Sequence, residues 1–412
     1  MRISVISDLH LGFSIHPETE ADSYENALEA FQKALDSDII IISGDFFDTK
    51  NPKPYAWYSA LKLLSMPLLE TSNVKLVAST KKLPAIFQKR SHQIPVIAIH
   101  GNHDRNLKGE KNIIEALEHA GLLIYLHRDT VVFEKNGERV AIHGMSHVPE
   151  RFAYEMLKDW NPKPVENAIN ILVLHQNIDQ YVYSPIQLPT ITLDNLPEGF
   201  DIIVNGHVHN RIIQKFKNGY FIIPGSTIIT QFQPVEAEVE KGIIKIDIKD
   251  KKINVDFVPL EKNRKFFYVK TDVRDGWKDE LREKILRILQ KNLEKKPIIK
   301  LKIIGKELNI FDFDQKEFES EFKNKAILFF SKDITLSEIE KKFEILRNLR
   351  EQKVSIREMG FVLLKKNLEI LGFGDSFDYE RIMKILEDGN VDLAMDILLG
   401  NVKDLGSFLE KP

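Results

Sequence analysis

The chain has 412 residues, of which 43% are hydrophobic and 29% are charged; its formal net charge is −3 and it contains no cysteine. This composition is ordinary for a globular protein of two or three domains, and it excludes disulfides, zinc fingers and thiol catalysis. No apolar run approaches the roughly 18 residues of a membrane helix, and an apolar stretch at residues 3–6 argues against a signal peptide, so we expect a cytoplasmic protein without a membrane span.

Residues 1–258 alternate short apolar strands with helices predicted at 23–35, 55–64 and 112–120, and they shift to strands from about residue 141. This pattern predicts an α/β domain with two packed sheets flanked by helices. A polar linker at 262–265 leads to a strand at 266–270, a helix at 277–293 and a strand at 297–304. These elements predict a small α+β domain at 262–352, and helical periodicity then predicts a helical segment at 353–412.

Five of the apolar strands in the first domain each end in residues that bind hard metal ions. In chain order, these residues are Asp8 with His10, Asp45, Asn102, His175, and His207 with His209. Two divalent ions roughly 3.5–4 Å apart can hydrolyse a phosphodiester, and such a pair needs a shared carboxylate, further oxygen ligands and neutral imidazoles. Residues two apart on a strand project from the same face, so Asp8 and His10 could hold one ion together.

Each of these groups also has a simple structural interpretation. A single buried histidine such as His175 is more often a hydrogen-bonded core residue than a ligand, and Asp8 or Asp45 alone could be a turn residue. Five independent accidents in this order are improbable. The series therefore indicates a two-metal phosphoesterase.

The motifs around these ligands resemble the calcineurin-like metallophosphoesterase superfamily. Within it, the sequence is similar to the nuclease subunit of the archaeal and eukaryotic DNA double-strand-break repair complex and to its bacterial SbcD-type exonuclease counterparts. The matching stretches are residues 6–12, 99–105, 142–145, 172–176, 196–200, 206–209 and 224–226. The resemblance implies a four-layer β-sandwich flanked by helices, with a capping, DNA-binding domain at 262–352.

The resemblance also implies roles for individual residues. One ion would be held by Asp8, His10, Asp45 and His209, and the other by Asp45, Asn102, His175 and His207, with Asp45 as the bridge. His103 would be the catalytic acid that faces the scissile phosphate, and water would be the nucleophile. Manganese is the expected metal.

The resemblance has one departure, because Asp48 stands where archaeal relatives often carry a histidine. Its carboxylate could accept a hydrogen bond from the His103 ring and raise the pKa of that ring, which makes Asp48 a second candidate catalytic residue. A structural role as a helix N-cap or turn residue ahead of Asn51 is the alternative.

Basic and aromatic residues suggest where DNA would bind. Lys50, Lys53 and Arg105 lie beside the metal-ligand motifs, and residues 290–306 contain six lysines and one glutamate. Such a run is otherwise a solvated face. No phosphate-binding loop is present, so any dependence on ATP must come from a partner.

Two further surfaces are expected from the resemblance. Relatives form homodimers through a four-helix contact, which corresponds here to Trp57, Leu61, Leu64, Ile113 and Leu117, although a monomer could also bury these residues. A helix-loop-helix at 376–400 corresponds to the segment that grips an SMC-like coiled-coil ATPase. Its apolar stripes contain Tyr379, Ile382, Met383, Leu386 and Leu398, and docking on the chain's own second domain is the alternative.

These features predict a nucleoid-associated two-metal DNA nuclease, with 3′-to-5′ exonuclease and single-strand endonuclease activity, that works with an SMC-like ATPase. A phosphodiesterase or phosphatase acting on nucleotides or phosphoproteins is an alternative. Against a protein phosphatase, Thr49-Lys50 stands where Arg-Gly would be expected. A non-catalytic interaction module is the third hypothesis, but such a module would be expected to have lost ligands.

Overall fold

The computed structural model describes residues 1–89, 92–106, 110–179, 181–182, 191–305 and 315–334. The chain separates into two compact units, Met1–Asp333 and Ile334–Pro412. The predicted helical segment at 353–412, with its helix-loop-helix at 376–400, lies outside the described residues. Within the described part of the chain, no helix is long and apolar enough to cross a membrane.

The first sheet has six strands in the order β13-β12-β1-β2-β4-β5. Its strands are β1 (Arg2–Ile6), β2 (Ile39–Ser43), β4 (Val96–Ile99), β5 (Ile124–Tyr125), β12 (Gly242–Lys249) and β13 (Lys252–Pro259). Strands β1, β2, β4 and β5 are parallel, whereas β12 and β13 form an antiparallel edge. Strand β2 is buried along its whole length, and its first four residues are isoleucines, as expected for a parallel strand covered on both faces.

The second sheet has seven strands in the order β10-β11-β9-β8-β7-β6-β3. Its strands are β3 (Lys75–Ser79), β6 (Asp129–Lys135), β7 (Glu138–Met145), β8 (Ile169–Leu174), β9 (Ile202–Asn205), β10 (Ile212–Phe216) and β11 (Gly219–Ile223). Strands β7, β8, β9 and β11 are parallel, and antiparallel strands extend the sheet at both ends.

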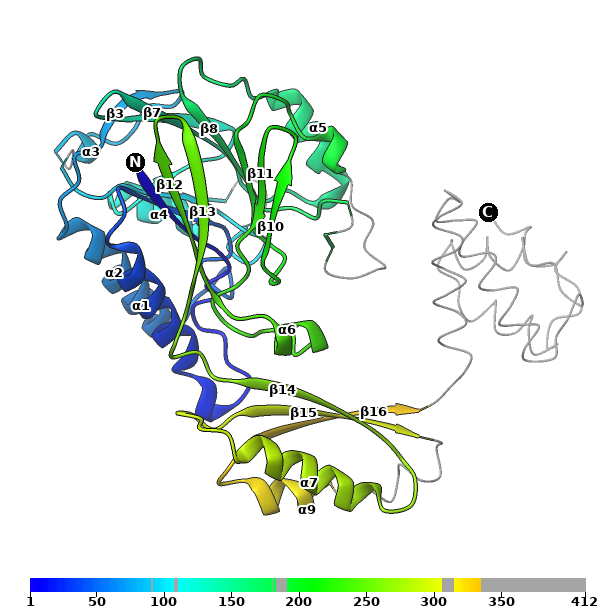
Figure 1. Ribbon diagram of the computed structural model, residues 1–412. Helices are drawn as coiled ribbons and strands as arrows, with labels where there is room; N and C mark the ends of the chain where they lie inside the picture. Colours follow the sequence, from blue (N-terminus) through cyan, green and yellow to red (C-terminus); the bar gives the residue numbers. More distant parts are fainter. Residues whose placement is uncertain (90–91, 107–109, 180, 183–190, 306–314, 335–412) are drawn as a thin grey trace, which may run out of the picture. The chain divides into compact units, whose positions relative to one another are not determined.

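The two sheets pack face to face, and helices cover their outer faces (Figure 1). Ile3 and Val5 of the first sheet share one apolar core with Ile142 and Val173 of the second. The helices are α1 (Asp22–Ala34), α2 (Pro54–Ser65), α3 (Ile86–Lys89), α4 (Ile113–His119), α5 (Glu150–Trp160) and α6 (Pro234–Glu238), with short 3₁₀ turns at Pro17–Thr19, Met66–Leu68 and Leu193–Asn195. Helices α1, α2 and α4 cover the first sheet, and α5 packs on the second. The predicted four-layer α/β sandwich is confirmed.

A smaller α/β module follows the sandwich. It contains β14 (Phe266–Asp272), α7 (Trp277–Leu289), β15 (Ile298–Gly305), α9 (Gln315–Phe322) and β16 (Ile327–Ile334), with strand order β14-β15-β16. The module has its own apolar core, in which Leu281, Ile285, Leu301 and Phe318 are buried. Helix α7 ends at Leu289, four residues before the predicted end at 293.

The linker between sandwich and module is not simply a polar, solvated stretch. Arg264 is only 8% exposed and makes a two-pronged contact with Asp22 of α1, with Nε–Oδ2 and Nη2–Oδ1 distances of 2.5 and 3.0 Å. Lys295 contacts Glu25 at 2.6 Å, and Lys296 contacts Glu18 at 2.8 Å. Two of the six lysines at 290–306 therefore join the module to α1 and to the 3₁₀ turn before it, and they do not form a free basic face.

Candidate metal centre

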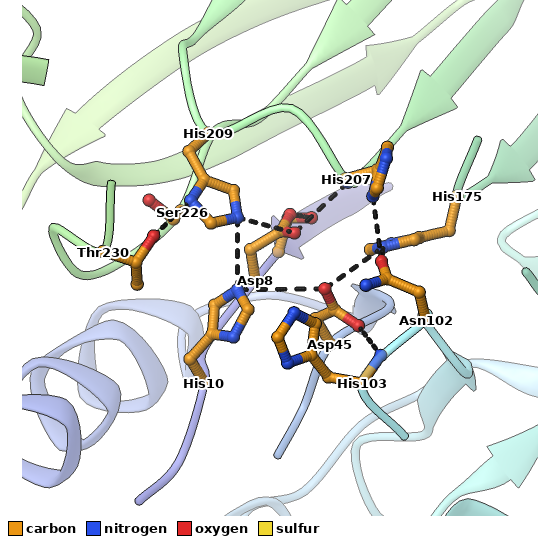
Figure 2. A network of polar contacts seen from close by, with 12 residues as sticks. Asp8, His10, Asp45, Asn102, His103, His175, His207, His209, Ser226 and Thr230 are labelled. Carbon is orange, nitrogen blue, oxygen red and sulfur yellow. Dashed lines mark hydrogen bonds and ion pairs between the residues drawn. The ribbon is translucent and has the colours of Figure 1, made fainter. Parts of the chain in front are cut away.

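The candidate ligands meet because their strands end at one edge of the sandwich. Strands β1, β2, β4, β8 and β9 end at residues 6, 43, 99, 174 and 205, and ligands follow each end within a few residues. Since the carboxyl ends of parallel strands face the same way, the loops after them converge (Figure 2). The spacing of Asp8 and His10 had suggested that both lie on a strand, but they do not. They lie in the loop after β1, with φ angles of 48° and 44°.

The first ligand group consists of Asp8, His10 and His209, whose ligand atoms all lie within 4.8 Å of one another. His209 Nε2 is 3.1 Å from His10 Nε2 and 3.5 Å from Asp8 Oδ1. All three residues are buried, so the donor atoms face each other and not solvent. Two imidazole nitrogens and a carboxylate oxygen in this arrangement suit a divalent transition metal.

The second ligand group consists of Asp45, His175 and His207, together with the side-chain oxygen of Asn102. Asn102 Oδ1 lies 3.2 Å from His175 Nε2 and 2.9 Å from His207 Nδ1. His175 Nε2 is also 3.3 Å from Asp45 Oδ2. The donor atoms again converge on one point, with carboxylate, amide and imidazole chemistry in one place.

Asp45 faces both groups. Its Oδ2 atom is 3.3 Å from His175 Nε2 in the second group and 3.8 Å from His10 Nε2 in the first. Its Oδ1 atom accepts a hydrogen bond from the His103 backbone N–H at 2.9 Å. One carboxylate between two sets of ligands is what a pair of neighbouring divalent ions requires, because the shared negative charge reduces their repulsion.

The electrostatics of the two groups favour cations. Burial alone would raise the pKa of Asp45, but the neighbouring His175 and His10 hold it well below its ordinary value. Burial lowers the pKa of His175, yet Asp45 and Asp8 outweigh it and raise that pKa to about 9. Burial and His175 together lower the pKa of His207 to about 3. The site therefore holds ionised carboxylates next to at least one neutral imidazole, as metal ligation requires.

Glycines before the ligands allow the close approach of the loops. Gly44 has a φ angle of 100°, and a Cβ atom there would lie 2.1 Å from His175 Nδ1. A Cβ atom on Gly101 would lie 2.0 Å from Asp45 Oδ1. Asp45 itself has a φ angle of 47°, a conformation that is unfavourable for a residue with a side chain and typical of functional sites. The glycine before Asp45 and the glycine before Asn102 are thus required for steric reasons.

One supporting residue beside the candidate ligands, Asp104, was missed by the sequence interpretation. Asp104 is fully buried and accepts hydrogen bonds from the backbone N–H groups of Phe46, Phe47 and Gly101 at 3.0, 2.8 and 3.1 Å. It therefore joins the loops that carry Asp45 and Asn102. Its place as the last residue of the Gly-Asn-His-Asp motif is a signal that could have identified it.

The structure differs from the sequence prediction for Asp48. The His103 ring contacts the backbone carbonyl of Asp48, with Nδ1 2.7 Å from the oxygen, while the Asp48 carboxylate is 3.9 Å away. That carboxylate lies closer to His10 Nδ1, at 3.3 Å. Asp48 is not a helix N-cap either, because α2 begins after Lys53 and has no side-chain cap, but it lies in a bend ahead of Asn51, in agreement with the turn alternative. A carboxylate behind a ligand histidine fixes which ring nitrogen carries the proton, which is how many metal-binding histidines are oriented.

The predicted DNA-binding residues lie at the surface near this edge. Lys50 and Lys53 are exposed and Arg105 is half-buried. The side chain of His103 is 40% exposed, so it is accessible from solvent while its backbone contacts Asp45.

The predicted dimer residues divide into two classes. Leu64, Ile113 and Leu117 are buried in the chain's own core, at 0%, 6% and 1% exposure, so they are not available to a second copy. Trp57 is half-buried against the same core, and Leu61 is 46% exposed. Both helices turn these three side chains toward the sheet, so the monomer buries them, as the alternative expected, and the dimer stays a prediction.

Comparison with known proteins gives a consistent picture. Residues 1–211 match the family model described as calcineurin-like phosphoesterase. The double-strand break repair protein mus-23 of Neurospora crassa is 27% identical over 65% of this chain and 40% of its own length, and MRE11 of Mus musculus is 28% identical over 65% and 42%. The DNA double-strand break repair protein Mre11 of Methanopyrus kandleri is 26% identical over 70% and 63%. The chain thus spans about two fifths of the length of the first two relatives.

Proposed function

Because the chain belongs to the calcineurin-like phosphoesterase family, we propose that it is a two-metal nuclease that processes DNA ends in double-strand-break repair. The observation that carries the proposal is the position of Asp45, whose carboxylate faces both ligand groups. The names of the relatives support DNA repair as the setting.

The donor set fits two divalent ions, and manganese is the proposed metal. Asp8, His10, Asp45 and His209 would hold one ion, and Asp45, Asn102, His175 and His207 the other. When bound, the ions would supply positive charge that polarises the phosphate and lowers the pKa of water. The carboxylates and imidazoles of this chain would hold that charge in place, and no side-chain nucleophile is required.

His103 is the proposed acid. A backbone carbonyl only accepts hydrogen bonds, so the contact with the Asp48 carbonyl places a proton on His103 Nδ1. The other ring nitrogen, Nε2, is then the atom that gains or donates a proton during the reaction. As an imidazolium, it would donate this proton to the leaving oxygen of the scissile phosphodiester.

We propose DNA as the substrate, with 3′-to-5′ exonuclease and single-strand endonuclease activity. The exposed Lys50 and Lys53 and the half-buried Arg105 would contact the phosphate backbone, and such contacts make binding depend on salt. The module that begins near residue 262 is the proposed capping domain. Lys295 is paired with Glu25 of α1 and Lys296 with Glu18 of the preceding 3₁₀ turn, so we do not assign them to DNA.

The test is an assay of the full chain with manganese on end-labelled duplex and single-stranded DNA, with and without EDTA. The same protein is offered bis(p-nitrophenyl) phosphate and a phosphopeptide. We expect DNA cleavage that EDTA abolishes and that His103→Asn removes. Hydrolysis of the phosphopeptide without DNA cleavage would instead favour a phosphatase, and inactivity on every substrate would favour a binding module.

Two assemblies are part of the proposal. The chain would form a homodimer through α2 and α4, the helices predicted at 55–64 and 112–120, and it would bind an SMC-like ATPase through residues 376–400. Deletion of 375–412 should leave cleavage of short DNA intact, because the proposed ligands and His103 precede residue 210, and it should abolish co-purification with the ATPase. Met383→Glu and Leu386→Glu should have the same effect, because a charge in a desolvated contact is unfavourable. Undiminished co-purification would refute the assignment.

A further inference from the structure

A buried lysine and glutamate lie next to His209. The side chains of Lys241 and Glu236 are each only 1% exposed, and Lys241 Nζ is 2.9 Å from Glu236 Oε1. The same ammonium contacts Ser226 Oγ at 2.8 Å and the backbone carbonyl of His209 at 3.2 Å. Since a buried ion pair contributes little net stability compared with an apolar pair, its role is better sought in the conformation that it holds.

Glu236 holds the loop that follows Ser226. Its carboxylate accepts hydrogen bonds from the backbone N–H groups of Thr230, Gln231 and Phe232 at 3.4, 2.7 and 2.9 Å. Three successive amides that converge on one anion form a fixed concave turn. Phe232 has a φ angle of 53° in this turn, a conformation that persists only where the surroundings impose it.

Thr230 connects this loop to the metal ligand. Its hydroxyl oxygen lies 2.6 Å from His209 Nδ1, while His209 Nε2 faces Asp8 and His10 in the first ligand group (Figure 2). A neutral imidazole has one protonated nitrogen, and a nitrogen that binds a metal must be unprotonated. A hydroxyl that accepts a hydrogen bond from Nδ1 therefore orients the ring and leaves Nε2 free to ligate.

We propose that Thr230, Glu236 and Lys241 are positioning residues for the metal ligand His209. These residues hold His209 at two points. The Thr230 hydroxyl contacts the His209 ring, and the Lys241 ammonium contacts the His209 backbone carbonyl. The inference rests on the proposed function, because it assigns these residues to one of the two ions. It concerns the ion held by the first ligand group and not the other.

The end of this loop at Phe232 packs against the smaller α/β module. The Phe232 ring lies 5.4 Å from the Phe266 ring of β14 and 5.6 Å from the Phe329 ring of β16, measured between centroids. Ile229 belongs to the same apolar cluster, together with Ile298 of β15. The loop that orients His209 therefore contacts the module through Phe232, two residues after Thr230. Docking of the module and the orientation of one metal ligand depend on one short segment.

The test measures manganese binding to the full chain by electron paramagnetic resonance and calorimetry, which does not rely on nuclease activity. Thr230→Val keeps the shape of the side chain but removes the hydroxyl, whereas Thr230→Ser keeps the hydroxyl. We expect Thr230→Val to weaken the affinity for one of the two manganese ions by about 10- to 100-fold, as loss of a hydrogen-bond partner of a metal ligand typically does. At intermediate manganese its spectrum should be that of isolated ions and not of a coupled pair. Thr230→Ser should bind as the wild type does.

Two further variants provide a control and a second test. Thr271→Val removes another buried threonine hydroxyl, in β14, and should leave both affinities unchanged. The double variant Glu236→Gln, Lys241→Met removes both buried charges together and should show the same selective loss as Thr230→Val. Wild-type affinity for both ions in Thr230→Val would overturn the inference even if the double variant does not fold. Absence of manganese binding in the wild type would overturn the proposed function, and this inference with it.

Discussion

The junction between sandwich and module provides the most quantitative prediction, the effect of Arg264→Met. Arg264 makes four hydrogen bonds, two to the Asp22 carboxylate and one each to the carbonyls of Lys296 and Glu18. Methionine keeps much of the buried volume but makes none of them. Asp22 would then be a buried carboxylate whose remaining cationic neighbour is Lys295, at 3.3 Å.

The expected loss of stability follows from that geometry. Removal of one partner of a buried ion pair costs about 3 to 5 kcal/mol, because the other charge stays buried. Lys295 still contacts Asp22, which favours the lower end, about 3 kcal/mol. The carbonyls of Lys296 and Glu18 also lose their hydrogen-bond donor, which increases the expected loss of stability. Replacement of both partners, Arg264→Met with Asp22→Asn, should restore part of the loss, since no charge is then left unpaired.

The assay is urea unfolding followed by circular dichroism, with limited proteolysis between residues 258 and 266 as a second measure of the junction. Arg287→Met is the matched control, because the contact of Arg287 with Glu283 joins two side chains that are 76% and 69% exposed. Such surface pairs contribute about 0 to 1 kcal/mol. A loss below about 1 kcal/mol for Arg264→Met, or equal losses in both variants, would refute the assignment of a buried, structural ion pair.

Three further predictions concern the metal centre, the dimer and the acid limit of stability. Asp45→Ala should abolish manganese binding, whereas His103→Asn should retain both ions by metal analysis and lose DNA cleavage; equal loss of metal in the two variants would contradict these roles. Leu61→Glu should convert a dimer into a monomer in light scattering without changing the melting temperature, because Leu61 is 46% exposed; a wild-type monomer at micromolar concentration would refute the dimer. Burial raises the pKa of Glu29, but the backbone amides of 261–262 outweigh it and lower that pKa below its ordinary value of 4.5. Its stabilising effect is then present at neutral pH and lost as the pH falls through the lowered value, so Glu29→Gln should reduce the urea midpoint at pH 7 and make no difference in strong acid; a pH-independent difference would contradict this.

The sequence alone indicated the fold and the ligands because both depend on local signals. An apolar strand followed within two residues by Asp45 or His175 marks a candidate ligand, and the series of five such strand ends indicates a metal site. Helices at residues 54–65 and 113–119 follow from periodicity within about a dozen residues. The order of these signals along the chain was enough to predict a sandwich with ligands at one edge.

Only the tertiary structure decided how the side chains pair across distant segments. Asp48 could approach either His103 or His10, and the fold of three separate loops places its carboxylate nearer to His10. Periodicity identified apolar helix positions, but it could not tell that Leu64 and Leu117 face the sheet while Leu61 faces solvent.

The three residues proposed to position His209 could not be identified from the sequence either. Thr230, Glu236 and Lys241 belong to no motif that the sequence made visible, and each residue type is common in loops. Their significance comes from contacts with His209, more than twenty positions earlier in the case of Thr230. Local sequence determines which residues can ligate or form a strand. Which lysine is buried, which carboxylate faces which histidine and which loop supports a ligand depend on packing between segments that meet only in the folded chain.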